Sequence, residues 1–393
     1  MYVDGLLSGA STATYSIAGR NGSGTDGIAY KRLEDALTAI QANGNVIIRS
    51  GAYSAVTNYA ANAQCCFWIQ QAVTIQNYGG EAVTLTYTGG SPPLIGTDYG
   101  PIIYATASNW TLDGVTVSGT RPLGDSPGGG DTDVNIQFGG TIGNVVTRNC
   151  TITNAGHAGV KFQATSGQVL VERNHFGTTG FTGRDHHVYA HDGNATYPAI
   201  FRFNEMTAAS GYALHWYDQA VNMQAYGNII HHCGGNYTPV GGGGILMSGT
   251  GHLIVGNTIT DCTGYGGIVF WKNAAGGNIV KNNIIRNGAN VTDDIVLDAA
   301  FGPNTVGHNN KHTISADPNG AYAPGGTDLD TDPLFVSGSP ATWIDYRLQA
   351  GSPMIAAGEA QSSPFNQALD PAATTTPTAK TQGAPPTIGG FTT

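Results

Sequence analysis

The stretch VLVERNHF at residues 169–176 carries a pattern that recurs along the chain: a short apolar strand, a bend that contains an asparagine, and the start of a second apolar strand. The other copies are AIFRFNEM (199–206), MQAYGNII (223–230), LIVGNTI (253–259) and IVKNNII (279–285), with a less regular one, VVTRNCTI, at 145–152. The asparagines of the five clear copies are Asn174, Asn204, Asn228, Asn257 and Asn283, separated by 30, 24, 29 and 26 residues. A period of this length is typical of repeat proteins.

A further short strand follows each copy, often after a glycine, and no helical period interrupts it. These strands are GVKF (159–162), HVYA (187–190), ALHW (213–216), GILM (244–247), GIVF (267–270) and DIVL (294–297). A repeat made of short strands cannot bury its own inner face, so neighbouring repeats must stack. The sequence therefore predicts an all-β chain that forms a single right-handed parallel β-helix, with the repeated asparagines turned inward as a ladder of amides.

The two ends of the chain differ from the repeats. Residues 28–43 have apolar side chains at helical spacing, which predicts an amphipathic helix with Asp26 as its N-cap and Gly44 as its stop. Such a helix would cover the open end of the stack. The Pro- and Thr-rich stretch from Pro371 is expected either to pack along the β-helix or to form a disordered linker. The predicted organisation is a capping segment at 1–44, rungs at 45–315 and a closing segment at 316–393.

Composition and charge exclude several classes of protein. The formal net charge of -10 argues against a nucleic-acid partner, which would need a basic surface. No apolar run approaches the roughly 18 residues of a membrane span. The five cysteines are odd in number and lack metal-binding spacing, so neither a disulfide scaffold nor a zinc site is expected. Cys233 and Cys262 occupy equivalent positions in neighbouring repeats, and we favour a stacked pair of buried thiols over a disulfide.

Strand alternation sorts each repeat into an inner and an outer face. One inner column is apolar throughout: Val160, Val188, Leu214, Ile245, Ile268 and Ile295. The outer column beside it is Lys161, Tyr189, His215, Leu246, Val269 and Val296, and the next is Gln163, His191, Tyr217, Ser248, Trp271 and Asp298. With rungs about 4.8 Å apart, Tyr189 is expected beside His215, and His191 beside Tyr217.

Further segments show a resemblance to a known superfamily. They are YVDG (2–5), AYKRLEDALTAIQANGNVIIRSGAY (29–53), DPLFV (332–336) and DYRLQAGSPMIAAG (345–358). Together with the asparagine-bearing repeats, they make most of the chain similar to the pectate-lyase-like superfamily of secreted β-helix proteins. The resemblance is specific for the fold and weak for the substrate, because the superfamily includes lyases, hydrolases, epimerases, phage tailspikes and non-enzymatic surface proteins.

The resemblance implies that the Tyr and His cluster lines the polysaccharide groove. Cleavage of a uronate polymer by β-elimination needs a base for the C5 proton, an acid for the leaving oxygen, and a partner for the carboxylate. We assign His215 and Tyr189 as the acid and base, and His191 with Tyr217 as a second pair or a sugar platform. Substrate contacts are expected from Lys161 and Arg184, which could hold the carboxylate, and from His187, Asp192, Asp218 and Trp271.

Other interpretations of these residues remain open. The outward aromatic rings could stack only on one another, and the imidazoles could be solvated surface groups. His187, His191 and His215 could instead hold a transition metal, although their spacing does not favour it. Asp192 and Asp218 could form the carboxylate pair of a glycoside hydrolase, or could simply end their strands.

The sequence therefore predicts a secreted or surface-displayed polysaccharide lyase that acts on an acidic glycan. The alternatives are a glycoside hydrolase, a C5-epimerase that uses the same Tyr and His residues, and a phage or cell-surface β-helix that only binds glycan. No metal site is assigned and no cofactor is required, although the aspartates of the glycine-rich loop 119–135 make Ca²⁺ binding a second interpretation of that loop. The sugar, its linkage and the oligomeric state stay open.

Overall fold

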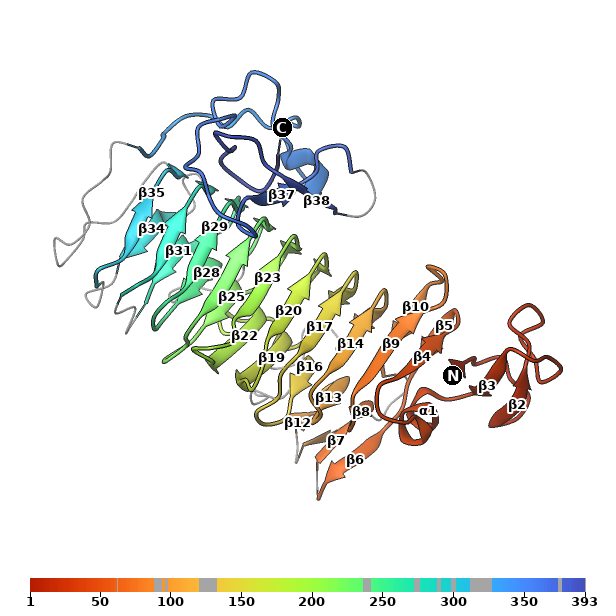
Figure 1. Ribbon diagram of the computed structural model, residues 1–393. Coiled ribbons are helices and arrows are strands. Elements are labelled where there is room, and N and C mark those ends of the chain that lie inside the picture. Colours follow the sequence, from red (N-terminus) through yellow and green to blue (C-terminus); the bar gives the residue numbers. More distant parts are fainter. Residues whose placement is uncertain are drawn as a thin grey trace.

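The structure is a computed structural model of the chain, and it shows an elongated stack of short strands (Figure 1). It describes residues 1–61, 63–87, 94–95, 98–119, 133–235, 242–271, 276–287, 291–297, 302–311, 327–373 and 377–392. Within these ranges the strands form three long sheets, so the parallel β-helix predicted from the repeats is confirmed. No helix in the described part of the chain is long and apolar enough to cross a membrane.

Each rung passes through three sheets in turn. Sheet 1 consists of β1 (Tyr2–Val3), β2 (Ser11–Tyr15), β3 (Gly27–Tyr30), β4 (Gly44–Ile48), β9 (Val73–Asn77), β14 (Trp110–Asp113), β17 (Val145–Arg148), β20 (Val169–Glu172), β23 (Ala199–Arg202), β26 (Met223–Tyr226), β29 (Leu253–Val255), β32 (Ile279–Lys281) and β35 (Thr305–Gly307). Sheet 2 consists of β5 (Gly51–Tyr53), β10 (Val83–Leu85), β15 (Thr116–Ser118), β18 (Thr151–Thr153), β21 (His175–Phe176), β24 (Glu205–Thr207), β27 (Ile229–His231), β30 (Thr258–Thr260), β33 (Ile284–Arg286) and β36 (Asn310–Lys311). Sheet 3 consists of β8 (Phe67–Ile69), β13 (Ile103–Ala105), β16 (Val134–Phe138), β19 (Ala158–Ala164), β22 (His186–Gly193), β25 (Tyr212–Trp216), β28 (Gly243–Met247), β31 (Gly264–Phe270) and β34 (Val291–Leu297).

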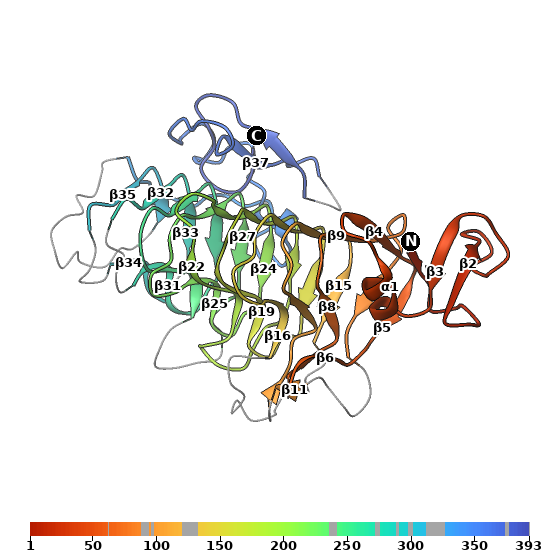
Figure 2. The ribbon, with the colours of Figure 1, turned by 60° about the horizontal axis from the view of Figure 1, so that its bottom comes forward.

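Two small antiparallel sheets lie outside the stack. One projects from its N-terminal half, close to β8 and β13 in chain order, and the other belongs to the C-terminal segment (Figure 2). Their strands are β6 (Thr57–Ala60), β7 (Ala63–Cys65), β11 (Leu94–Ile95) and β12 (Asp98–Tyr99), and β37 (Gln367–Leu369) with β38 (Ala379–Thr381). The described helices are α1 (Leu33–Ala39) and the 3-10 helix η2 (Trp343–Tyr346).

The rungs of sheet 3 pair in parallel and in register. Lys161 of β19 lies opposite Tyr189 of β22, and Tyr189 lies opposite His215 of β25. The same column continues through Leu246 to Val269. These are the neighbours predicted from the alternation of apolar and polar residues, so the predicted outer column is confirmed. Parallel pairing thus places residues from distant parts of the sequence one rung apart.

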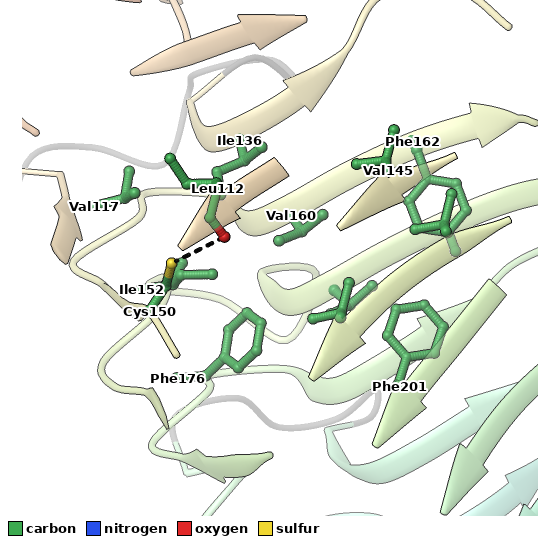
Figure 3. Close-up of a cluster of buried hydrophobic side chains, with 14 of the residues drawn as sticks. Leu112, Val117, Ile136, Val145, Cys150, Ile152, Val160, Phe162, Phe176 and Phe201 are labelled. Carbon is green, nitrogen blue, oxygen red and sulfur yellow. Dashed lines mark hydrogen bonds between the residues drawn. The ribbon is translucent and has the colours of Figure 1, made fainter. Parts of the chain in front are cut away.

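The core between the sheets is apolar and holds a row of aromatic rings along the axis. The rings of Phe138 and Phe162 stack with centroids 5.4 Å apart. Phe162 continues to Phe201 at 6.3 Å (Figure 3). Phe201 in turn stacks on Trp216 at 6.1 Å. Because a close-packed core tolerates little displacement, each rung fixes the position of the next.

The asparagine ladder is confirmed and has a regular geometry. The backbone N–H of Asn204 donates to Asn228 Oδ1 at 3.0 Å, and the backbone N–H of Asn228 donates to Asn257 Oδ1 in the same way. The Nδ2 of Asn228 donates to the carbonyl of Phe201 at 2.8 Å, inside the turn. A residue with left-handed backbone precedes each ladder position, such as Phe203 with φ of 56°. The buried amides thus satisfy the backbone groups that the bend between sheets 1 and 2 leaves exposed to the core.

The N-terminal end of the stack is covered by α1. Its residues Leu33, Ala36 and Leu37 are buried and join the same apolar cluster as Val46 and Phe67 of the first rung. Figure 2 shows α1 across this end of the sheets. The helix therefore shields the first rung from edge-to-edge pairing, as its apolar face predicts.

The extent of this helix was wrongly predicted at both ends. Gly27–Tyr30 form β3, because they pair with β1 and β2 and this pairing overrides the local helical spacing. Asp26 does not cap α1; its Oδ2 accepts the amide N–H of Ile17 at 2.7 Å. Ile40 already has extended backbone as the C-cap, and Gly44 begins β4 rather than stopping the helix.

The C-terminal segment packs along sheet 1. Trp343 and Phe391 stack nearly parallel, with centroids 6.0 Å apart, and belong to a buried cluster with Ile200 and Tyr226 of sheet 1. The backbone N–H of Gly390 donates to Thr258 Oγ1 at 3.0 Å. Of the two alternatives for the Pro- and Thr-rich stretch, its described residues therefore adopt the packed one (Figure 1).

Replacement of a ladder amide should destabilise the whole stack. Asn228→Ala removes the acceptor of the Asn204 backbone N–H and the side-chain donor to the Phe201 carbonyl, so we expect the free energy of unfolding to fall by roughly 3 kcal/mol. Urea unfolding followed by circular dichroism measures this change. The control is Asn58→Ala, at an exposed residue of β6 whose side chain accepts a hydrogen bond from Gln64, and it should change the value by about 0.5 kcal/mol or less. Equal effects of the two substitutions would show that the ladder does not hold the rungs together.

Candidate active site

The structure brings the four predicted acid–base residues together on the outer face of sheet 3. The ring centroids of Tyr189 and His215 are 5.1 Å apart and nearly perpendicular, and those of His191 and Tyr217 are 5.8 Å apart. Tyr189 also stacks on Tyr217 at 6.2 Å. We call these four side chains the Tyr/His array. Because they lie on the adjacent strands β22 and β25, the backbone of the β-helix fixes their spacing.

His215 receives its orientation from His186, which sequence reasoning missed. His186 is buried at the corner where β22 begins, and its Nε2 lies 2.6 Å from His215 Nδ1. The backbone N–H of Tyr212 donates to His186 Nδ1 at 3.0 Å. Since a backbone N–H can only donate, Nδ1 of neutral His186 is the acceptor and the ring proton is on Nε2. This Nε2–H group donates a hydrogen bond to His215 Nδ1. Neutral His215 must then carry its own proton on Nε2, so it presents an N–H donor.

Burial keeps both imidazoles neutral. Burial is the first cause that lowers the pKa of His186 well below its usual value, and the neighbouring imidazoles of His215, His157 and His187 lower it further. Burial, followed by the charge of His157, lowers the pKa of His215 to about 3. His215 is therefore a neutral hydrogen-bond donor at neutral pH rather than a cation.

A carboxylate–imidazole pair, His157 with Asp185, lies beside Tyr189 and was also missed. His157 Nδ1 lies 3.2 Å from Asp185 Oδ1, and the other carboxylate oxygen accepts the backbone N–H groups of Phe181 and Thr182. The ring of His157 lies 5.9 Å from that of Tyr189. The pair therefore backs Tyr189 with a fixed polar group, as carboxylate–imidazole pairs do in many active sites.

Lys161 supplies a positive charge at the array. Its side chain is only 9% exposed, and its Nζ lies 5.5 Å from the ring centroid of Tyr189. A buried ammonium beside a phenol stabilises negative charge that develops on or near the phenolic oxygen. The structure thus brings this predicted residue into contact with the array.

His191 differs from His215 in its hydrogen bonding. Its Nδ1 lies 2.6 Å from Asp192 Oδ1, and its Nε2 lies 4.0 Å from Asp218 Oδ2. The carboxylate of Asp192 accepts a hydrogen bond from the Nδ1–H group. In its neutral form, His191 therefore has an unprotonated Nε2. The two predicted carboxylates therefore flank an imidazole. His191 offers an acceptor where His215 offers a donor.

The structure contradicts the predicted role of His187. Its side chain is fully buried, its Nδ1 bonds to Thr179 Oγ1 at 2.9 Å, and its ring lies 5.5 Å from Phe176 in the core. The chain turns a corner before Val188, so strand alternation fails at this position. His187 therefore does not face a substrate, and it does not join His191 and His215 in the transition-metal site that was considered as an alternative.

A column of small residues could have revealed this corner. The positions equivalent to His187 in other rungs are Gly159, Ala213, Gly244 and Gly267. A Cβ at Gly159 would lie 3.2 Å from the inward side chains of Ile152 and Phe176. Small residues at one repeat position thus indicate an inward-facing corner, and the residue before each of them faces outward.

Two further predicted contacts lie away from the array. Arg184 is in the loop before β22, and its side chain is exposed. Trp271 follows β31 and packs edge-on against Tyr265, with ring centroids 6.1 Å apart, beside an outward apolar cluster that contains Leu246 and Val269. Trp271 is thus two rungs beyond Tyr217.

The described residues offer no ligand set for a metal. Among them, no three His, Cys, Asp or Glu side chains group as a metal site would require. Near the array, Asp185 is already used by two backbone amides, and Asp192 bonds to His191. Residues 120–132 of the loop considered for Ca²⁺ lie outside the described ranges.

Cys233 and Cys262 are both free and buried, which confirms the stacked thiols.

A cavity of 320 Å³ lies between sheet 2 and the C-terminal segment, with Arg173, His175, Glu205 and Trp343 among its lining residues. Burial alone would raise the pKa of Glu205, but hydrogen bonds from His175 and His231 lower it to about 2. Trp343 also donates its backbone N–H to this carboxylate, so Glu205 anchors η2 on the β-helix.

Comparison with known proteins agrees with this architecture. Residues 181–328 match the family described as "Right handed beta helix region". No curated protein matches the sequence. The crystal structure of pectate lyase Pel9A is similar with a TM-score of 0.49 and 14% identity, over 100% of this chain and 96% of that chain. The Azotobacter vinelandii mannuronan C-5 epimerase AlgE4 A-module has a TM-score of 0.44 and 14% identity, over 72% and 82%.

The family match supplies the handedness that sheet pairing alone leaves open. With the three-sheet topology, it confirms a right-handed parallel β-helix. Fold does not fix the chemistry, which must be argued from the array.

The tautomer of His215 can be observed directly. We expect nitrogen NMR of the imidazoles to show His215 protonated at Nε2, with no titration of this ring between pH 5 and pH 8, because its pKa lies near 3. His186→Ala removes the hydrogen-bond donor to His215 Nδ1, so we expect this variant to show both the Nδ1–H and the Nε2–H forms of His215. Detection of the Nδ1–H form of His215 in the unaltered protein would contradict the proposed hydrogen-bond chain.

Stability should fall with acid. The fully buried His186 and His252 have lowered pKa values, that of His252 to about 4, whereas an unfolded chain protonates histidine near pH 6.5. The unfolded state therefore binds more protons below pH 6.5. As the pH falls from 6.5 to 5, we expect each of these imidazoles to lower the free energy of unfolding by roughly 2 kcal/mol. Urea midpoints at the two pH values measure the loss, and a stability that is flat or rises toward pH 5 would show that these rings become protonated in the folded protein.

Proposed function

We propose that this right-handed parallel β-helix is a secreted or surface-displayed polysaccharide lyase that cleaves a uronate-containing glycan by β-elimination. The observation that carries the proposal is the different hydrogen bonding of two imidazoles on β22 and β25: His215 presents an N–H, and the neutral form of His191, whose Nδ1 bonds to Asp192, presents an unprotonated Nε2. A pure binding surface gains nothing from two imidazoles held in opposite tautomers, one by the buried His186 and the other by the half-exposed Asp192. Acid–base chemistry requires such a pair.

The substrate carboxylate is assigned to His215. A neutral imidazole N–H that donates to this carboxylate stabilises the charge that develops when the C5 proton leaves, as neutral imidazoles do for other enolate-like intermediates. The hydrogen bond from His186 holds the ring for this task. The tautomer thus changes the role of His215 from a member of the acid–base pair to a hydrogen-bond donor.

Proton transfer is assigned to His191 and Tyr189. His191 Nε2 takes the C5 proton, the C5–H electrons form the C4–C5 double bond, and the bond from C4 to the glycosidic oxygen breaks. The Tyr189 hydroxyl donates its proton to the departing oxygen. Lys161, 5.5 Å from the Tyr189 ring centroid, stabilises the phenolate that results.

The array offers local attraction for a substrate carboxylate in a protein whose net charge is negative. A net charge of -10 repels a polyanion at long range. Close to the array, however, a carboxylate would meet the ammonium of Lys161 and the N–H of His215. We therefore expect binding to be weak at low ionic strength and to improve when salt screens the long-range repulsion.

Two other enzyme activities could use some of the same residues. A C5-epimerase would use the same proton abstraction and return a proton to the other face of the sugar without breaking the chain. A glycoside hydrolase would use Asp192 and Asp218, which are half exposed on either side of His191. The products separate these cases, because only elimination creates an ultraviolet-absorbing double bond.

The test is an ultraviolet absorbance assay on alginate, pectate, glucuronan and glycosaminoglycans. We expect absorbance to grow with the unaltered protein. His191→Ala should reduce kcat/KM by about 10² to 10⁴, and His215→Ala by about 10² to 10³. The matched control is His232→Asn, which replaces an exposed imidazole at the end of β27 with a residue that tolerates its left-handed backbone (φ of 54°) and should leave activity unchanged.

The outcomes distinguish the candidate functions. Reducing ends without absorbance, lost in Asp192→Asn, would replace the lyase with a hydrolase. Exchange of the C5 hydrogen with solvent, without chain cleavage, would indicate the epimerase. Full activity in both His191→Ala and His215→Ala would overturn the assignment of the array.

A further inference from the structure

The outer column of the array continues toward the N-terminal end of sheet 3, and aromatic side chains occupy it there. From Tyr189 the register passes through Lys161 and Gln137 to Tyr104 of β13, and Tyr104 lies opposite Trp68 of β8. Tyr104 is thus three rungs, about 14 Å, from Tyr189 on the same face. The two sets of side chains share one straight line along the axis.

A third ring joins this aromatic pair from outside the β-helix. Tyr59 of β6, in the small antiparallel sheet, stacks on Tyr104 with centroids 3.9 Å apart and planes 22° apart. It also lies 6.3 Å from Trp68, whose Nε1 donates to Thr106 Oγ1 at 3.0 Å. Figure 2 shows β6 and β11 projecting beside this end of the sheet. We call Tyr59, Trp68 and Tyr104 the aromatic platform; all three rings are partly exposed.

The platform extends toward the array because one backbone position is a glycine. The Tyr104 ring lies over Gly139, at the end of β16 on the next rung. A Cβ at Gly139 would be 2.2 Å from the Tyr104 hydroxyl oxygen and 2.3 Å from the ring carbon that carries it. Contacts this short cannot form, so any other residue would push the ring aside. The close approach, and not the backbone angle, therefore requires this glycine.

We propose that the aromatic platform is a sugar-binding subsite for the glycan that the array cleaves, three rungs from the reacting bond. This inference rests on the proposed function and adds the requirement for a long substrate. Partly exposed Tyr and Trp rings pack against the apolar C–H face of a pyranose and keep their polar edges in water. A glycan that extends along the helix axis passes from the array over Lys161 and Gln137 to the platform.

The alternative explanation is that the three rings only pack against one another. Mutual stacking accounts for the contact of Tyr59 with Tyr104, but it does not require Tyr104 to reach across the rung boundary over Gly139 toward the array. The two explanations predict different dependence of activity on chain length. A subsite contributes only to substrates long enough to reach it.

The experiment compares kcat/KM for a short and a long oligosaccharide of the glycan found in the absorbance assay. We expect Trp68→Ala to lower the value about tenfold for the long chain and to leave the short chain unchanged. Gly139→Ala should act in the same direction, because it displaces the Tyr104 ring without removing any aromatic group. The control is Tyr197→Ala, at a 46% exposed aromatic residue between β22 and β23, which should alter neither substrate.

The outcomes separate this inference from the proposed function. If the unaltered protein cleaves both chains and the ratio of long to short is the same in Trp68→Ala and Gly139→Ala, the platform is structural and the lyase assignment stands. An equal loss for both chain lengths would likewise overturn the subsite, since it would indicate a general effect on the fold. If the unaltered protein neither binds nor cleaves any uronate glycan, both proposals fail together.

Discussion

The inward asparagine ladder is the constraint on which the rest of the molecule depends. Each amide bonds to the next rung and to the bent backbone, so the rungs cannot slip relative to one another without losing several buried hydrogen bonds at once. A slip of one residue would also exchange the inner and outer faces of every strand. Because the register is fixed on the inside, the outside can carry side chains chosen for chemistry. The Tyr/His array occupies positions whose spacing the ladder maintains.

Within the array, function follows from how each imidazole is held. His186 accepts a hydrogen bond from a backbone N–H and donates one to His215, whereas Asp192 accepts a hydrogen bond from His191. Two identical side chains thereby become a donor and an acceptor, which is the division of labour that elimination next to a carboxylate needs. Such preorganisation costs nothing at the moment of reaction, because the partners were placed during folding. The same reasoning explains the histidines buried near the array, which would otherwise be an unusual use of core volume.

Sequence periodicity predicts the sheets, the ladder and the outer column, because strand alternation and a fixed repeat determine which residues become neighbours. It fails where the chain leaves the strand. At the corner before Val188 the alternation breaks, so His187 turns into the core and His186 joins the array instead. His157 and Asp185 were missed because a loop brings them together. Local spacing also extended the predicted helix over Ile28–Tyr30, where pairing with β1 makes a strand. Each error lies where tertiary contacts override a local pattern.

The most direct measurement is a crystal structure of the His191→Ala variant with a uronate oligosaccharide. The account predicts a sugar carboxylate within hydrogen-bonding distance of His215 Nε2 and a glycan that runs along the axis over sheet 3. An oligosaccharide held instead in the cavity beside Glu205 and Trp343, or across sheet 1, would contradict the claim that the outer face of sheet 3 carries the chemistry.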